Sequence, residues 1–139
     1  MKEAVDAMHL KVLTAAAVVY DEMIQYAEIP LVNGGVGVLQ NHAPMIGAVT
    51  DGVLKVKRDG NMEYLAVSQG VVNVAHNEIV LLVRTAECAE NIDMARAAAS
   101  EKRARERLHD FDSGWDMKRA EISLHRALAR QTAAHLAGR

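Results

Sequence analysis

The chain has 139 residues and a formal net charge of −2, and 50% of its residues are hydrophobic. This size fits one ordinary domain or a small domain with an appendage, and the hydrophobic content is sufficient for a packed core. Aromatic residues make up only 4% of the chain, which leaves few rings on which bases could stack. We therefore expect no nucleic-acid partner.

The sequence predicts an intracellular protein without a membrane span of its own. Its single cysteine, Cys88, cannot form an internal disulfide, and the first residues lack the pattern of a secretory signal. The longest apolar stretch, residues 12–19, is much shorter than the roughly 20 residues that cross a bilayer. No activating base adjoins Cys88 in the sequence, so we expect it to be a part-buried structural residue.

Residues 9–83 form a series of short segments with β character. Turn residues separate them, and Asp59-Gly60 is a strong hairpin signal. The turn count predicts roughly eight to ten antiparallel strands in a sandwich or barrel, which we assign to a domain over residues 1–88. The clearest segments are "HLKVL", "GVGVL", "VLKVK", "EYLAV", "GVVNV" and "EIVLLV".

After Glu87 the glycines nearly vanish, and alanine, arginine and glutamate become frequent, as in exposed helices. Asn91 is a candidate cap for a first helix that runs to about His109 and has Asp93 in its first turn. The predicted fold class is therefore α+β, with an N-terminal antiparallel β-sandwich followed by a C-terminal antiparallel helical hairpin over residues 89–139.

A break in the helical pattern divides this hairpin. The stretch "DFDSG", residues 110–114, interrupts it, and Trp115 or Asp116 opens a second helix. The apolar faces that we expect are thin and rich in alanine, so they bury little area and the hairpin should be able to open. They comprise Ile92, Ala95, Ala99 and Leu108 on the first helix and Ala120, Leu124, Ala127, Leu128 and Ala134 on the second.

The charges are distributed unevenly. Residues 1–90 carry 6 Lys/Arg against 11 Asp/Glu, whereas residues 91–139 carry 10 against 7. A basic tail on an acidic body suggests that the tail meets an anionic group.

The arginines of the tail lie in two stripes. Arg96 and Arg103 share one face of the first helix, and Arg119, Arg126 and Arg130 share a face of the second. If the helices are antiparallel, the two stripes can converge.

Three explanations of these stripes remain open. A solvated, salt-bridged surface predicts acids three or four residues away, and Arg119 has one in Asp116. Arg126 and Arg130 have none, and as like charges on adjacent turns they favour an external anion. A triphosphate or an acidic segment of a partner would serve equally well.

Catalytic chemistry finds little support. The six histidines are scattered without metal-ligand spacing, and neither a phosphate-binding loop nor a dinucleotide fingerprint is present. We expect no metal site, no catalytic residue and no required cofactor. The chain is predicted not to be an enzyme.

Three motifs extend over much of the chain: "GGVGVLQNHAPM" at residues 34–45, "AVSQGVVNV" at residues 66–74, and "VRTAECAENIDMARA" at the passage into the hairpin. Together they resemble one known family, the epsilon subunit of the F-type ATP synthase, and the resemblance covers nearly the whole chain. The resemblance implies a β-sandwich that docks on the gamma subunit and the c-subunit ring, with a loop containing His42 facing the ring.

The same resemblance implies regulation by the hairpin. When extended, the hairpin would insert along gamma towards the alpha and beta subunits and inhibit ATP hydrolysis. The chain would then be a non-catalytic rotor subunit that couples proton transport to ATP synthesis. It would be peripheral at the cytoplasmic face of the bacterial membrane and reach the membrane only through the complex.

Some bacterial members of this family bind ATP in the folded-down form, through a motif that "IDMARA", residues 92–97, matches at every fixed position. In these members carboxylates accept hydrogen bonds from the adenine or ribose end, and arginines hold the triphosphate, for which their planar forks are suited. ATP is thus a candidate regulatory ligand, with magnesium dependence open. The positions implied here are Glu87, Ile92, Asp93, Arg96, Ala97, Arg103, Arg119, Arg126 and Arg130.

An alternative function stays open beside this one. The basic helices could bind acidic surfaces of partner proteins with no nucleotide at all, which predicts salt-sensitive association and no effect of ATP. On that interpretation "IDMARA" is ordinary helix-start chemistry, with Asp93 as a first-turn acid and Arg96 as its partner.

Overall fold

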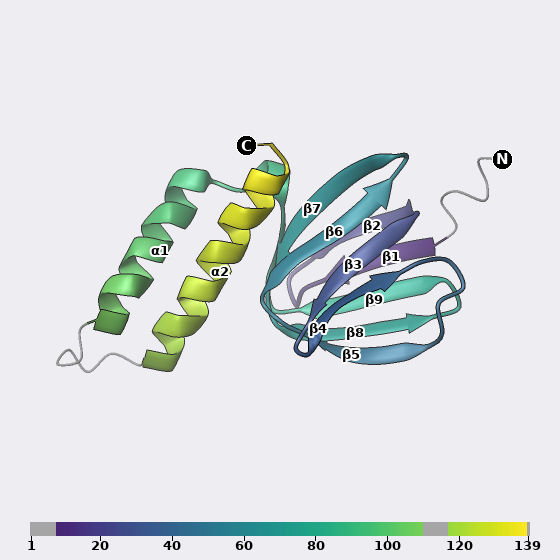
Figure 1. Cartoon of the computed structure of the whole chain (residues 1–139), viewed down its shortest axis with the longest axis horizontal. Coiled ribbons are helices and arrows are strands. Elements are labelled where there is room, and N and C mark those ends of the chain that lie inside the picture. The colour runs from purple at the N-terminus through teal and green to yellow at the C-terminus, as the bar shows by residue number, and fades with distance from the viewer. Residues whose placement is uncertain (1–7, 110–116, 139) are drawn as a thin grey trace.

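The computed structural model describes residues 8–109 and 117–138, which form a β-sandwich followed by two antiparallel helices (Figure 1). The predicted fold class is confirmed. The predicted break at residues 110–114 and the predicted helix start at Trp115 or Asp116 lie outside the described residues.

Ten strands build the sandwich, at the upper end of the predicted number. They are β1 (Met8–Leu13), β2 (Val18–Ile24), β3 (Tyr26–Leu31), β4 (Gly34–Val38), β5 (Met45–Val49), β6 (Gly52–Arg58), β7 (Asn61–Val67), β8 (Gly70–Ala75), β9 (Glu78–Val83) and β10 (Ala86–Cys88). All six segments quoted above coincide with strands.

The strands follow one continuous hydrogen-bonded order, β10-β7-β6-β3-β5-β8-β9-β1-β2, with β4 paired to β3. This sheet folds back on itself, so that β2 approaches β6 and β10 and the sandwich is nearly closed. Most pairings are antiparallel, as expected, but β1 pairs with β9 in parallel. The sequence pattern did not predict that pairing, because alternation of side chains defines a strand without defining its neighbours.

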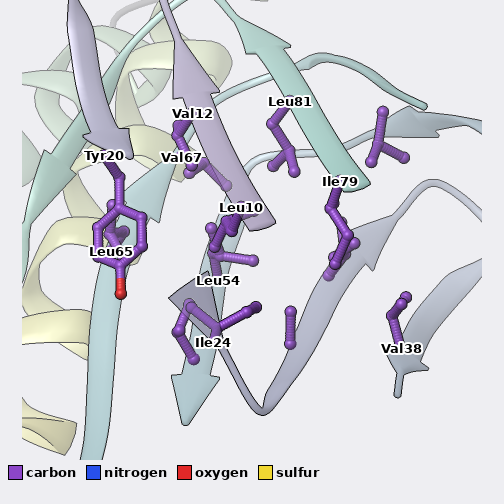
Figure 2. Close-up of a cluster of buried hydrophobic side chains, with 14 of the residues drawn as sticks. Leu10, Val12, Tyr20, Ile24, Val38, Leu54, Leu65, Val67, Ile79 and Leu81 are labelled. Atoms are coloured by element: carbon purple, nitrogen blue, oxygen red, sulfur yellow. The ribbon is translucent and has the colours of Figure 1, made fainter. Parts of the chain in front are cut away.

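Alternating burial along the strands creates one interior. In β1 the side chains of Met8, Leu10 and Val12 are buried and those between them are partly exposed, as expected where successive side chains point to opposite faces of a sheet. Figure 2 shows side chains such as Leu54 and Ile79, from two further strands, directed into the same interior. Every fully buried member of this cluster lies within residues 8–83.

Two-residue turns join two of the hairpins. Asp59 and Gly60 connect β6 to β7 with φ of 51° and 78°, and His76 and Asn77 connect β8 to β9 with φ of 51° and 59°. Two consecutive positive φ values suit the right-handed twist of the flanking strands. The hairpin predicted from Asp59-Gly60 is confirmed.

The helices are α1 (Met94–His109) and α2 (Met117–Leu136), and the first ends where the sequence predicted. The predicted cap was wrong. Residues 89–91 form a short 3-10 turn, so Asn91 lies before the helix. The side chain of Asp93 caps α1 instead, because its Oδ1 accepts a 3.0 Å hydrogen bond from the backbone N–H of Arg96.

Alanines form the seam between the two helices. Ala97 and Ala104 on α1 are buried, as are Ala120, Ala127 and Ala134 on α2. The seven-residue spacing of each set places its members on one face. The alanines predicted for α1, Ala95 and Ala99, are exposed; the interface lies on another face of the helix, the one that carries Ala97 and Ala104.

The helices are layered on the sandwich in reverse of their chain order. Helix α2 packs on β6 and β7, and α1 packs on α2, so that α2 lies between α1 and the strands (Figure 1). The contact with the sandwich is a second cluster of small and medium side chains, namely Ala66, Ala89, Ile92, Ala133 and Ala134, with Val53, Tyr64 and Met94 beside them. Within the described residues, neither helix is long and apolar enough to cross a membrane.

Candidate functional site

A pocket of about 410 Å³ lies where the two helices meet the sandwich. Strands β7 and β10 supply one wall, together with Thr85 just before β10, and α1 and α2 supply the rest. Its volume is typical of small-ligand sites. Because three separate parts of the chain line it, the pocket exists only while the hairpin is folded against the sandwich.

Five arginines line this pocket, which we call the arginine pocket: Arg96, Arg103 and Arg107 from α1, and Arg126 and Arg130 from α2. The two basic stripes predicted from the sequence therefore converge. Arg107 was not among the predicted residues, although a signal for it exists in the sequence. The spacing of Arg96, Arg103 and Arg107 repeats the offsets of seven and four seen in α2 at 119, 126 and 130.

Glu87 is the single acid among the described residues that line the arginine pocket. Its Oε1 accepts a 3.1 Å hydrogen bond from Nε of Arg130, which links β10 directly to α2. The arginine pocket is accordingly strongly positive, with five arginines and one acid among its described lining residues.

Two of the guanidinium groups, those of Arg96 and Arg126, make no hydrogen bond or ion pair within the described ranges. Arg103 donates a 3.2 Å hydrogen bond to the hydroxyl of Ser100, which orients it without neutralising it. Such an arrangement differs from an ordinary salt-bridged surface, of which Arg105 and Glu101, with Nε and Oε2 2.7 Å apart on α1, are an example.

The other four predicted positions do not line the arginine pocket. Ile92 is buried beneath α2 in the second cluster, and Ala97 is buried in the helix seam. Asp93 caps α1 and thereby fixes the turn that carries Arg96. Arg119 is exposed at the start of α2, and the acid expected as its partner, Asp116, lies outside the described residues.

His42 lies in the loop between β4 and β5. Its ring contacts the carbonyl oxygen of Ala43 at 2.7 Å from Nδ1. The loop is tied to the turn between β8 and β9, since Asn41 N–H donates to the side-chain oxygen of Asn77 at 2.6 Å. His42 is therefore held in an ordered loop at one end of the sandwich.

The Cys88 thiol is half-buried; burial first and then the charge of Glu90 raise its pKa, which disfavours the thiolate, the reactive form of cysteine. The part of the chain that the structure describes contains no group of three histidine, cysteine or acidic side chains able to hold a metal ion.

Comparison with known proteins places the chain in a family. Residues 7–89 match the family model of the ATP synthase delta/epsilon chain, beta-sandwich domain, and residues 90–134 match that of its long alpha-helix domain. The ATP synthase epsilon chain of Desulforamulus reducens is 41% identical over 125 residues, which cover 90% of this chain and 95% of that protein.

Two solved structures share the fold. One is a chain of the Euglena gracilis mitochondrial ATP synthase in an OSCP/F1/c-ring assembly, with a TM-score of 0.79, 21% identity, and coverage of 94% of this chain and 82% of that one. The other is a chain of the Tetrahymena thermophila mitochondrial ATP synthase, central stalk/c-ring, with a TM-score of 0.54, 11% identity, and coverage of 95% and 96%. With both family domains matched in order, this chain belongs to the delta/epsilon chain family of the ATP synthase.

Proposed function

We propose that this chain is a non-catalytic central-stalk subunit whose folded hairpin binds ATP and is stabilised by it. The observation that carries the proposal is the arginine pocket, in which two unpaired guanidinium groups face a site that closes only when α1, α2 and the sandwich meet. Five cations against one acid suit a triphosphate, because the bidentate fork of arginine matches phosphate oxygens.

Seven of the nine predicted residues receive a role in this proposal. Arg96, Arg103, Arg126 and Arg130 contact the phosphates, with Arg107 added from the structure. Three of the positions outside the arginine pocket act by support: Asp93 sets the start of α1, and Ile92 and Ala97 fix how the hairpin packs.

Binding to one arrangement of the hairpin gives regulation. A ligand shifts an equilibrium between two conformations only by its different affinity for them. The arginine pocket is assembled by the folded hairpin, so ATP stabilises that form. The extended hairpin, which inserts towards the alpha and beta subunits and inhibits hydrolysis, is then favoured when ATP is scarce.

The sandwich supplies a surface for docking on the gamma subunit. The outer face of β5, β8 and β9 exposes Ile46, Val71 and Leu82, whose exposed fractions are 80%, 52% and 51%. The ladder places Val71 opposite Leu82, and Ala48 opposite Val71. A contiguous apolar face of this kind is typical of a protein interface.

The loop that contains His42 precedes β5 directly and would face the c ring at the adjoining end of the sandwich. The Euglena assembly of F1 with the c ring and the Tetrahymena central stalk support this placement. The subunit would be peripheral at the cytoplasmic face of the membrane.

Calorimetric titration of ATP, with and without magnesium, into the full chain tests the nucleotide site. We expect saturable one-to-one binding, weakened about tenfold or more in Arg126→Ala, because a charge-assisted hydrogen bond to phosphate is lost. Lys102→Ala is the matched control. It removes a cation from the outer face of α1, outside the arginine pocket, and should change the affinity by less than about twofold.

The titration also distinguishes the ATP-binding proposal from the alternative function. Absence of heat at millimolar ATP would reject the nucleotide site and favour an interaction module whose arginines bind acidic surfaces of partner proteins. Equal loss of affinity in both variants would show a general charge effect and would equally reject a built phosphate site.

A further inference from the structure

The ligand-free arginine pocket contains one internal ion pair, and that pair uses groups that a ligand needs. Arg130 directs Nε at Oε1 of Glu87 at 3.1 Å. Both side chains remain partly accessible, at 24% and 37% of full exposure. Glu87 thus presents to Arg130 a planar, anionic pair of oxygens in the place where a phosphate would present its own.

We propose that Glu87 is an internal competitor for the phosphates: it occupies Arg130 in the ligand-free folded hairpin and must release it when a polyphosphate binds. This inference rests on the proposed function and specifies how its site is regulated. The sequence resemblance casts Glu87 as an acceptor for the nucleotide. In the geometry of the ligand-free pocket, Glu87 instead opposes binding of the phosphates, because it holds Arg130.

Arg130 has a limited set of donors for Glu87 and a phosphate to share. A guanidinium has five N–H donors in one rigid plane, and a carboxylate bonded at Nε occupies one edge of that plane. Phosphate oxygens that approach the same edge must displace the carboxylate. The displaced charge of Glu87 also stays in the arginine pocket, where it repels the phosphates.

The ion pair contributes little to the stability of the folded hairpin. Removing the charge of Glu87 should therefore have a net favourable effect on phosphate affinity. Pairs with this much solvent exposure are weak, because water screens them and both side chains lose freedom. The folded hairpin keeps its second cluster and the alanine seam when the pair is removed. Neutralising Glu87 should therefore weaken hairpin docking only slightly while it removes both the competitor and the repulsion.

The test is a titration with inorganic tripolyphosphate, which carries the phosphates without a base or ribose. Glu87→Gln keeps the shape of the side chain and removes its charge. We expect it to bind tripolyphosphate about fivefold more tightly than the unaltered chain, as for loss of one nearby negative charge in a solvent-screened site. The matched control is Glu90→Gln, three residues away and outside the arginine pocket, which should change the affinity by less than about twofold.

A second background isolates Arg130. If Glu87 competes through that arginine, Glu87→Gln should raise the affinity for tripolyphosphate clearly less, by about twofold, when Arg130 is already glutamine. The reason is that the effects of coupled residues are not additive. An equal gain in both backgrounds would overturn the inference, since Glu87 would then act by its charge alone.

The remaining outcomes separate this inference from the proposed function. Weaker or unchanged tripolyphosphate binding in Glu87→Gln, with ATP still bound by the unaltered chain, overturns the inference alone, because Glu87 then acts mainly by holding α2 in place. Absence of both tripolyphosphate and ATP binding, in the unaltered chain and in Glu87→Gln, overturns both. Tripolyphosphate binding that only Glu87→Gln shows supports the inference, with competition strong enough to block the site.

Discussion

The side-chain amide of Gln131 on α2 donates a 2.8 Å hydrogen bond from Nε2 to Oε1 of Glu101 on α1. Arg105 donates to the other oxygen of the same carboxylate at 2.7 Å. These two bonds, that of Gln131 first, lower the pKa of Glu101. The helices are thus joined by the alanine seam and this polar link. Helix α2 is joined to the sandwich mainly by other residues: Ala134 belongs to both contacts, but Ala133 belongs only to the second cluster, so a substitution at Ala133 tests the contact with the sandwich separately.

The contact between α2 and the sandwich should be sensitive to volume at Ala133, which is fully buried in the second cluster. Ala133→Leu adds atoms where there is no room, at a cost of about 1–3 kcal/mol. We expect faster amide hydrogen exchange in α2 and unchanged exchange in the sandwich. Ala98→Leu, on an exposed position of α1, is the control and should leave both rates unchanged. Faster exchange throughout the chain would contradict the separation of the two interfaces.

The sandwich should fold without the hairpin. Deletion of residues 91–139 removes no member of the main core, which lies within residues 8–83. We expect the truncated chain to retain its β circular dichroism and a cooperative thermal transition, and to bind purified gamma subunit. Its midpoint should fall by only a few degrees, because mainly small side chains of the second cluster become exposed. A non-cooperative melt would show instead that the hairpin is part of one indivisible domain.

Stability of the sandwich should decrease as the pH rises through neutrality, because of His9. Its ring pairs with Asp21 of β2 and, at 3.3 Å from Nδ1, with Glu78 of β9, which ties three neighbouring strands together. The hydrogen bond to Asp21, assisted by Glu78 and opposed by partial desolvation, raises the pKa of His9 above 6.5. A raised folded-state pKa means that the stabilisation is complete below the unfolded value and disappears as the pH passes the folded one.

Thermal melts from about pH 5.5 to about pH 8.5 measure this effect across the range in which histidine titrates. The melting temperature of the unaltered chain should decline over the upper part of that interval more steeply than that of His9→Gln. His125→Gln, exposed on α2, should keep the slope of the unaltered chain. Parallel curves of melting temperature against pH for the unaltered chain and His9→Gln would show that His9 does not cause the pH dependence.

Local patterns were sufficient to predict most of the fold. Alternating burial in β1 and the turn at Asp59-Gly60 depend on a few adjacent residues, so the sequence shows them directly. The arginine stripes are equally local, since residues seven apart on a helix share a face. The convergence of Arg96 and Arg126 in one pocket followed once the helices were antiparallel.

Features that depend on long-range packing could not be predicted. Asn91 and Asp93 are both good caps, and the choice between them is made by burial of Ile92, which leaves residues 89–91 in a separate turn. Alanine carries little hydrophobic signal, so the buried Ala97 could not be told from its exposed neighbours. The pair of Glu87 and Arg130 joins residues 43 positions apart, beyond any helical or strand period.

The reversed layering of the hairpin bears on how the protein acquires its structure during synthesis. The helix that touches the sandwich is the last element of the chain, and α1, which is made first, packs on that last element. A nascent chain can complete its sandwich while α1 still lacks the surface on which it packs. Docking must therefore wait until α2 leaves the ribosome, so the hairpin takes its place only after the sandwich has been able to fold.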